Sequence, residues 1–180
     1  MKRCLHWLLP ILLVGCGGDN DGSTGNSPPS DNPNGSSNAI LQLEQKGEIP
    51  KLERGTDLMG SDQNNNGVRD DIDSFIGRSY PVPNQQAAAT QSAKAFQQTL
   101  AVDKSDILAV KAANQTLSRA LNCLFDQFDG ENGTIGPARV SLEIKSATFN
   151  TKLRLLEYLT FSEALDGTSW ALPVGDTCER

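Results

Sequence analysis

Apolar side chains recur at intervals of three and four residues between positions 107 and 128, which is the spacing of one face of an α-helix. The seam consists of Ile107, Val110, Leu117, Leu121, Leu124 and Phe128. Asn114 interrupts it, and Ser105 or Asp106 stands just before it, where a helix N-cap is expected. We therefore expect a helix from about residue 106 to Phe128.

Three further segments carry helical patterns. Small residues dominate the apolar stripe of residues 85–102, and Asn84 stands in its N-cap position. Residues 138–165 carry two apolar faces, which predicts one long helix at the centre of the molecule with partners on several sides. Residues 72–76 predict a short helix that ends at Gly77.

These patterns predict an all-α fold for residues 39–180, which we expect to form one domain: a small bundle of about three long helices and one short helix. A chain of 180 residues has little length left for a second domain. Residues 39–46 have the pattern of another short helix, which Gly47 and Pro50 end. The chain from there to Gly60 is expected to be an extended arm that lies on the bundle.

The beginning of the chain has the pattern of an export signal. Lys2 and Arg3 form a basic start, and the apolar run Leu5–Val14 is too short to span a bilayer as a folded helix. The small residue Gly15 then precedes Cys16. We expect residues 1–15 to be a signal peptide that is removed from the mature chain.

The run Leu13-Val14-Gly15-Cys16 resembles the lipobox of bacterial lipoproteins. This resemblance implies cleavage before Cys16 and diacylation of that cysteine, which would anchor the chain in a membrane of the cell envelope. By the sorting rules of enterobacterial lipoproteins, Gly17 at the next position favours the outer membrane. The alternative is an ordinary cleaved signal peptide with an incidental cysteine.

Residues 17–38 contain only Gly, Asp, Asn, Ser, Pro and Thr. Such side chains cannot bury enough apolar surface to offset the entropy lost on ordering. We therefore expect residues 16–38 to be a lipid-bearing flexible tether, with a root-mean-square length of about 25 Å.

Charge and histidine content exclude several classes of function. Removal of residues 1–15 takes away Lys2 and Arg3 and no acid, so the formal net charge changes from −6 to −8. This acidity argues against nucleic acid as a partner, because nucleic acid requires a basic patch. The one histidine, His6, lies in the predicted signal peptide, so the cleaved chain has none for a catalytic triad, a histidine-ligated zinc site or a pH switch.

The four cysteines fit an exported protein. Cleavage removes Cys4 and lipidation uses Cys16, which leaves Cys123 and Cys178 to pair as a disulfide in an oxidising compartment. The alternative is Cys123 as a small buried apolar residue and Cys178 as a free thiol.

Side chains that carry oxygen atoms are concentrated in residues 62–73, which read DQNNNGVRDDID. Five of them stand at positions 1, 3, 5, 9 and 12 of this loop: Asp62, Asn64, Asn66, Asp70 and Asp73. Gly67 is at position 6, where calcium loops turn sharply, and the backbone carbonyl of Val68 follows at position 7. The pattern resembles the calcium loops of EF-hands, dockerins and thrombospondin type 3 repeats. This resemblance implies a structural calcium ion bound with the weak affinity of extracellular modules.

Two residues depart from the EF-hand pattern. Asp73 replaces the bidentate glutamate of position 12, and Arg69 stands at position 8, where paired EF-hands have an apolar residue. The loop also occurs once, whereas dockerins carry two. The alternative to a calcium site is an Asn-Gly turn before a helix that has Asp70 and Asp71 in its first turn.

Polar residues gather between Asn150 and Glu157, in the middle of the last predicted helix. Asn150 and Arg154 are four residues apart and could line a pocket beside Tyr158. We favour a solvent-exposed helix face with an ion pair between Arg154 and Glu157.

The sequence thus predicts a non-catalytic, membrane-anchored protein of the cell envelope, with a structural calcium site and an envelope protein or polymer as its partner. One alternative is a hydrolase that acts on an envelope or extracellular polymer through carboxylates or bound calcium. Its candidate acids, Glu143, Glu157 and Glu163, fall on one predicted helix, which does not identify a pair across a cleft. A second alternative is a dockerin-like assembly module.

Overall fold

The computed structural model describes residues 33–130, 135–171 and 173–179. Every regular element in these ranges is an α-helix, which confirms the predicted all-α class. The helices are α1 (Pro33–Gln45), α2 (Asp70–Ser79), α3 (Pro83–Ala101), α4 (Ile107–Gln127), α5 (Pro137–Thr148) and α6 (Lys152–Ala164). The predicted signal peptide and Cys16 lie outside the described residues.

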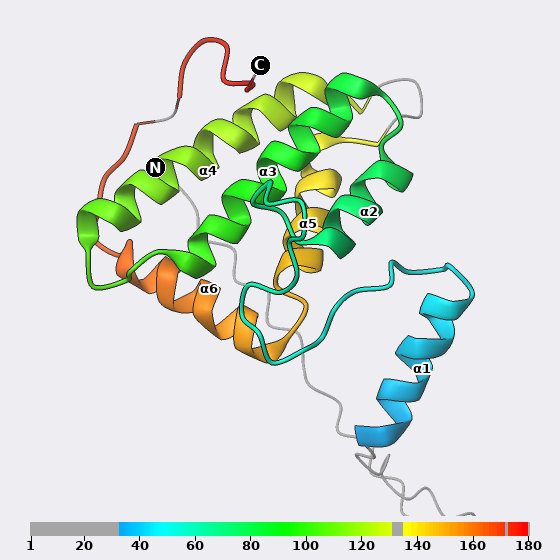
Figure 1. Cartoon of the computed structure of the whole chain (residues 1–180). Coiled ribbons are helices and arrows are strands. Elements are labelled where there is room, and N and C mark those ends of the chain that lie inside the picture. The colour runs from blue at the N-terminus through cyan, green and yellow to red at the C-terminus, as the bar shows by residue number, and fades with distance from the viewer. Residues whose placement is uncertain (1–32, 131–134, 172, 180) are drawn as a thin grey trace, which may run out of the picture.

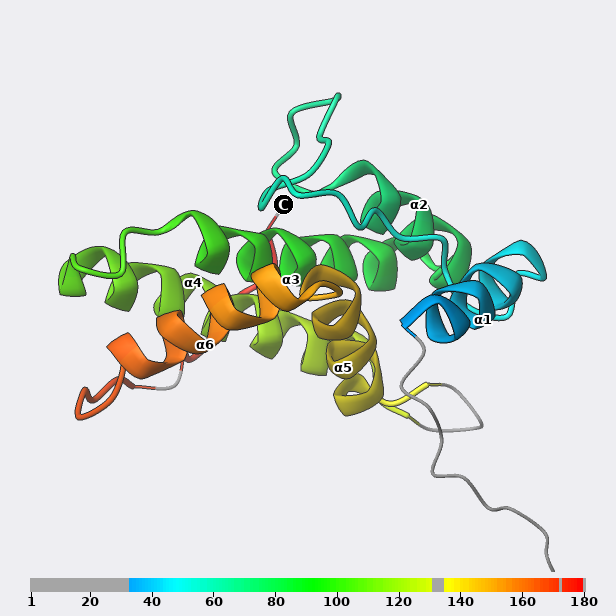
Figure 2. The ribbon, with the colours of Figure 1, turned by 90° about the horizontal axis from the view of Figure 1, so that it is seen from below.

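The central element is α3, which contacts α2, α4, α5 and α6 (Figure 1). Figure 2 shows α2 on one side of α3 and α5 and α6 on the other. Four alanines of α3 are almost completely buried: Ala88, Ala89, Ala93 and Ala95. Such small side chains let neighbouring helices approach α3 closely from several directions.

The predicted single helix over residues 138–165 is two helices. α5 ends at Thr148, and α6 begins at Lys152 after a short turn. The hydroxyl of Thr151 caps α6 by accepting a hydrogen bond from the backbone amide of Arg154 at 3.2 Å. The apolar residues of this segment are therefore divided between two short helices, and the bundle has two long helices, of 19 and 21 residues, rather than three.

The helix starts agree with the sequence in some places and differ in others. Asp106, one of the two expected residues, caps α4. α3 begins at Pro83, whose ring suits the first turn of a helix, so Asn84 is not the N-cap. α1 begins at Pro33 rather than at residue 39, so the last part of the predicted tether is helical.

Aromatic rings join helices in the core. The ring centroids of Tyr80 and Phe128 are 5.4 Å apart, and those of Phe96 and Phe149 are 5.8 Å apart, both in edge-to-face contact. The first pair connects the end of α2 to the end of α4, and the second connects α3 to the turn before α6.

Residues 46–69 run without regular secondary structure from α1 to α2 (Figure 1), and their first part, up to Gly60, is the predicted arm. Leu52, Leu58 and Met59 of the arm pack against the core. α1 itself lies at the edge of the molecule (Figures 1 and 2). The arm therefore belongs to the packed body, and it positions the loop that follows it.

The C-terminal tail returns to the bundle. Cys178 is disulfide-bonded to Cys123 of α4. The side-chain amide of Gln91 on α3 donates to the carbonyl of Thr177 at 3.0 Å and accepts from the backbone amide of Glu179 at 3.0 Å. The tail is thus fixed to both long helices.

Candidate functional site

The loop of residues 62–73 curls around the carboxylate of Asp62. Oδ1 of Asp62 accepts from the backbone amide of Asn66 at 3.1 Å, and Oδ2 accepts from that of Gly67 at 2.9 Å. Gly67 has a φ of +84°, which glycine adopts without steric strain. The glycine at position 6 therefore makes the sharp turn that the sequence pattern predicts.

Four of the five predicted side-chain ligands come together. Oδ2 of Asp73 accepts from Nδ2 of Asn66 at 2.6 Å and from Nδ2 of Asn64 at 3.3 Å. Oδ1 of Asn64 in turn accepts from the backbone amide of Asn66 at 3.0 Å. Asp62, Asn64, Asn66 and Asp73 thus form one hydrogen-bonded group, and the aspartate at position 12 reaches the loop despite its short side chain.

Asp70, the fifth predicted ligand, faces the beginning of the loop. Its Oδ2 accepts from Oγ of Ser61 at 2.9 Å, and its Oδ1 accepts from the backbone amide of Gln63 at 3.1 Å. Position 9 of calcium loops often reaches the ion through a water molecule, so an aspartate turned aside is compatible with that role. Val68 is completely buried in the core, which anchors the loop beside α2.

The donor set decides which metal could fit. Among the residues that the structure describes, no three His, Cys, Asp or Glu side chains gather as a metal-binding group. The loop instead combines two carboxylates, Asp62 and Asp73, with two amides, Asn64 and Asn66. Oxygen donors of this kind suit a hard cation such as calcium and do not suit zinc or copper. These four side chains are the ones that would hold the ion.

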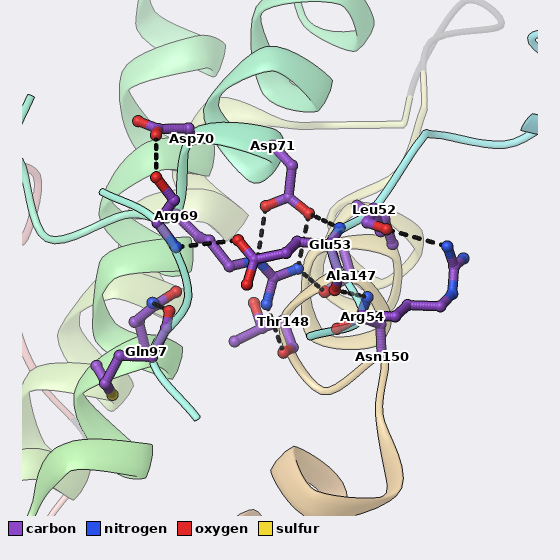
Figure 3. A network of polar contacts seen from close by, with 12 residues as sticks. Leu52, Glu53, Arg54, Arg69, Asp70, Asp71, Gln97, Ala147, Thr148 and Asn150 are labelled. Atoms are coloured by element: carbon purple, nitrogen blue, oxygen red, sulfur yellow. Dashed lines mark hydrogen bonds and ion pairs between the residues drawn. The ribbon is translucent and has the colours of Figure 1, made fainter. Parts of the chain in front are cut away.

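Arg69, at position 8 of the loop, is completely buried (Figure 3). Its guanidinium forms an ion pair with Asp71, with Nε 2.6 Å from Oδ1 and Nη2 3.0 Å from Oδ2. Nη2 also donates to the carbonyl of Ala147 at 3.0 Å, and Nη1 donates to that of Thr148 at 3.4 Å. Arg69 therefore binds the C-terminal end of α5, where carbonyl groups lack helical partners and attract positive charge.

Arg154, on α6, is also completely buried. Its guanidinium donates to the carbonyls of Glu53 (2.8 Å), Asp57 (2.9 Å) and Leu58 (3.0 Å) in the arm. The remaining bonds go to Oδ1 of Asn150 at 2.8 Å and to Oε1 of Glu53 at 3.4 Å. All five N–H donors of the side chain are thus used inside the protein.

Arg69, Arg154, Glu53 and Asp71 form what we call the arginine cluster. The two acids balance the two positive charges, and the backbone amide of Glu53 donates to Oδ2 of Asp71 at 2.6 Å. Burial, together with the positive charge of Arg69, lowers the pKa of Arg154 from its ordinary value. An arginine nevertheless stays protonated in proteins, so Arg154 keeps its positive charge at physiological pH.

Gly60 makes room for the arginine cluster. A Cβ atom at this position would overlap Cδ of Arg69 and lie 3.0 Å from Nη2 of Arg154. The φ of Gly60 is +72°, which other residues rarely adopt. A glycine is therefore required where the arm passes over both guanidinium groups.

The sequence interpretation missed this cluster. It placed Arg154 on an exposed helix face in an ion pair with Glu157, whereas Arg154 is buried and Glu157 pairs with Lys104 at 2.5 Å. The spacing of Asn150 and Arg154 was the available signal, because these two side chains are hydrogen-bonded. The burial itself comes from arm residues about one hundred positions earlier, which local spacing cannot reveal.

The three candidate acids of the hydrolase alternative are on two helices rather than one. Glu143 lies on α5, where it accepts from the Tyr80 hydroxyl at 2.9 Å and pairs with Arg139 at 2.6 Å. Glu157 and Glu163 lie on α6. Two of the three acids are therefore already held in ion pairs.

Comparison with family models, with curated proteins and with solved structures finds no match for this chain. Across the described ranges, no helix has both the length and the apolar character needed to cross a membrane.

Proposed function

We propose that this chain is a non-catalytic, lipid-anchored protein of the bacterial cell envelope that binds another envelope component. Cys16 would carry the lipid, and residues 17–32 would connect it to the helical body. The loop of residues 62–73 would hold a structural calcium ion.

The observation that carries the proposed binding role is the outer face of α6. Four leucines of this helix are each 45–50% exposed: Leu153, Leu155, Leu156 and Leu159. The helix buries Arg154 and Phe161 on its inner side. A cluster of large apolar side chains on the surface of a small domain is typical of a docking site. We call these four residues the leucine face.

A structural role for calcium is supported by the contacts that join the loop to the arm. The backbone amide of Asp70 donates to the carbonyl of Ser61 at 2.8 Å, and that of Ser61 donates to Oε2 of Glu53 at 3.0 Å. Arg69 of the same loop belongs to the arginine cluster. An ion bound by Asp62 and Asp73 would therefore stabilise the arm as well as the loop.

The calcium proposal is tested by thermal unfolding with EDTA and with calcium. If Kd lies near the weak extracellular range, about 10 mM calcium stabilises the folded chain by about 2 kcal/mol and raises Tm by about 5 °C. Asp62→Asn combined with Asp73→Asn should abolish this shift. Asp126→Asn, which removes a carboxylate from the exposed side of α4, should leave it unchanged. An identical Tm in EDTA and calcium would show that the loop is a metal-free turn.

The lipid anchor is tested by intact mass of the protein from a membrane fraction. The mature chain should begin at Cys16 and carry the added mass of its acyl chains, and Cys16→Ser should release the protein from the membrane. A chain that begins elsewhere without acyl mass would exclude this part of the proposal.

The binding role is tested by crosslinking in intact membranes. We expect a crosslinked partner with the unmodified chain and its loss when Leu156 and Leu159 are both replaced by Ser. Replacement of Val82 and Val174, which are also exposed but lie outside α6, is the matched control. Equal crosslinking by both double variants would argue against the leucine face as the docking site.

A further inference from the structure

A groove of about 690 Å³ lies where α4, the end of α6 and the segment after α6 meet. Its lining includes Asn114 from α4 and Leu159 and Glu163 from α6, with Leu165, Asp166 and Trp170 from the segment that follows. Figure 2 shows this end of α6, in orange, beside α4. Because Leu159 also belongs to the leucine face, the groove and that face are continuous.

Asn114 is a polar residue in an apolar position. It interrupts the apolar seam of α4 and is only 8% exposed. Within the described part of the chain, its side-chain amide makes no hydrogen bond to protein, and it lines the groove. The polar atoms of this amide are not fully buried, because the residue lines the open groove, so they are free to bond a ligand there.

The charges of the groove select the ligand. Glu163 and Asp166 are both acids, and the described residues that line the groove include no lysine or arginine. In the described ranges, the carboxylate of Glu163 has no ion-pair partner, and Asp166 accepts from the backbone amide of Gly167 at 2.9 Å. The indole of Trp170 is 54% exposed and can stack against a cation.

From this arrangement we propose that the groove receives a lysine or arginine side chain from an amphipathic segment of a partner protein. The aliphatic part of that side chain would lie on Leu159 and Leu165, and its cationic group would meet Glu163, Asp166 and the Trp170 ring. The amide oxygen of Asn114 accepts a hydrogen bond from it.

The proposal rests on the binding function proposed above and names the chemistry of the partner. Apolar residues of the same segment cover the leucine face, next to the groove. A basic peptide is favoured over a membrane surface, because the acids Glu163 and Asp166 would repel the phosphates of anionic lipids.

The test uses the fluorescence of Trp170. The sequence contains two tryptophans, so the full chain with Trp7→Phe reports Trp170 alone, and Cys16→Ser prevents acylation. The probes are a synthetic amphipathic helix of leucine and lysine and a matched peptide in which every lysine is glutamate. We expect saturable binding of the lysine peptide and at least tenfold weaker binding of the glutamate peptide.

Variants of the groove assign the effect to its residues. Glu163→Gln combined with Asp166→Asn should weaken binding of the lysine peptide at least fivefold, and Asp126→Asn, a charge-matched control on α4, should not. Asn114→Leu should also weaken binding while Tm stays the same or rises, because the side-chain amide has no partner inside the protein and leucine continues the apolar seam of α4. A purely structural Asn114 would instead lower Tm and leave binding unchanged.

Three results would overturn the proposal: equal binding of the two peptides, no effect of the double acid variant, or a larger Trp170 response to phosphatidylcholine vesicles than to the lysine peptide. The last result would mean that the leucine face binds a lipid surface rather than a basic peptide. Peptide binding does not depend on Cys16 acylation or on the calcium loop. If the lysine peptide does not bind but a crosslinked partner is still recovered, only the inference of a basic segment is wrong, and the proposed binding function stands.

Discussion

At the scale of single residues, Arg154 has the most extensive hydrogen bonding of any side chain in the described structure. Its five donors hold three arm carbonyls and two side chains, and nothing smaller can replace that geometry. We expect Arg154→Ala to lower the free energy of unfolding by about 3 kcal/mol, because it leaves buried carbonyls and Glu53 without partners. Urea unfolding measures this loss. Arg119→Ala, on the exposed side of α4, is the control, and an equal effect of both would contradict the role of the cluster.

Tyr80 gives the fold a pH dependence in alkaline solution. Its side chain is buried, and burial together with the carboxylate of Glu143 raises the pKa of its hydroxyl above the ordinary value of about 10. The unfolded chain therefore loses this proton first, so stability is present below pH 10 and falls as the pH rises above it. Tyr80→Phe should cost about 1 kcal/mol at neutral pH and make the alkaline loss shallower. Urea unfolding between pH 8 and pH 11 compares the two chains, and identical pH profiles would refute this assignment.

At the scale of elements, the break between α5 and α6 is what directs Arg154 into the arm. Thr151 fixes this break, because its hydroxyl accepts a hydrogen bond from the backbone amide of Arg154 in the first turn of α6. We expect Thr151→Ala to cost about 1 kcal/mol of unfolding free energy and Thr151→Ser, which keeps the cap, to cost much less. Denaturant titration of both variants is the measurement. Equal losses would mean that the methyl group, rather than the cap, stabilises the turn.

At the scale of the whole molecule, the Cys123–Cys178 disulfide joins the tail to α4 across a sequence separation of 55 residues. In the chain-entropy description, closing a loop of this length stabilises the fold by about 4 kcal/mol. Reduction should therefore lower the urea midpoint and release the tail from Gln91. The double variant Cys123→Ala and Cys178→Ala should show the same midpoint with and without reductant. Resistance of the unmodified chain to reductant in the unfolding assay would argue that the tail's hydrogen bonds suffice.

Sequence-based expectation and structure agree where the deciding interactions join residues that are close together along the chain. The helical spacing of residues 107–128, the cap at Asp106 and the turn at Gly67 depend on neighbours within a few residues, and the structure has all three. The error at residues 138–165 arose because two short helices with a capped turn have the same apolar spacing as one long helix. Capping at Thr151 was the local clue that separates them.

Local patterns of residues are enough to predict the helical class, the spacing of oxygen donors in residues 62–73 and the two cysteines available to pair. Tertiary structure alone decided that α3 is central, that two arginines are buried and that Asn114 faces a groove. The physical reason is the distance along the chain: Arg154 meets Glu53 across 101 residues. A buried charge is stable only when residues from distant parts of the chain pair with it. Local sequence patterns do not show which distant residues these are.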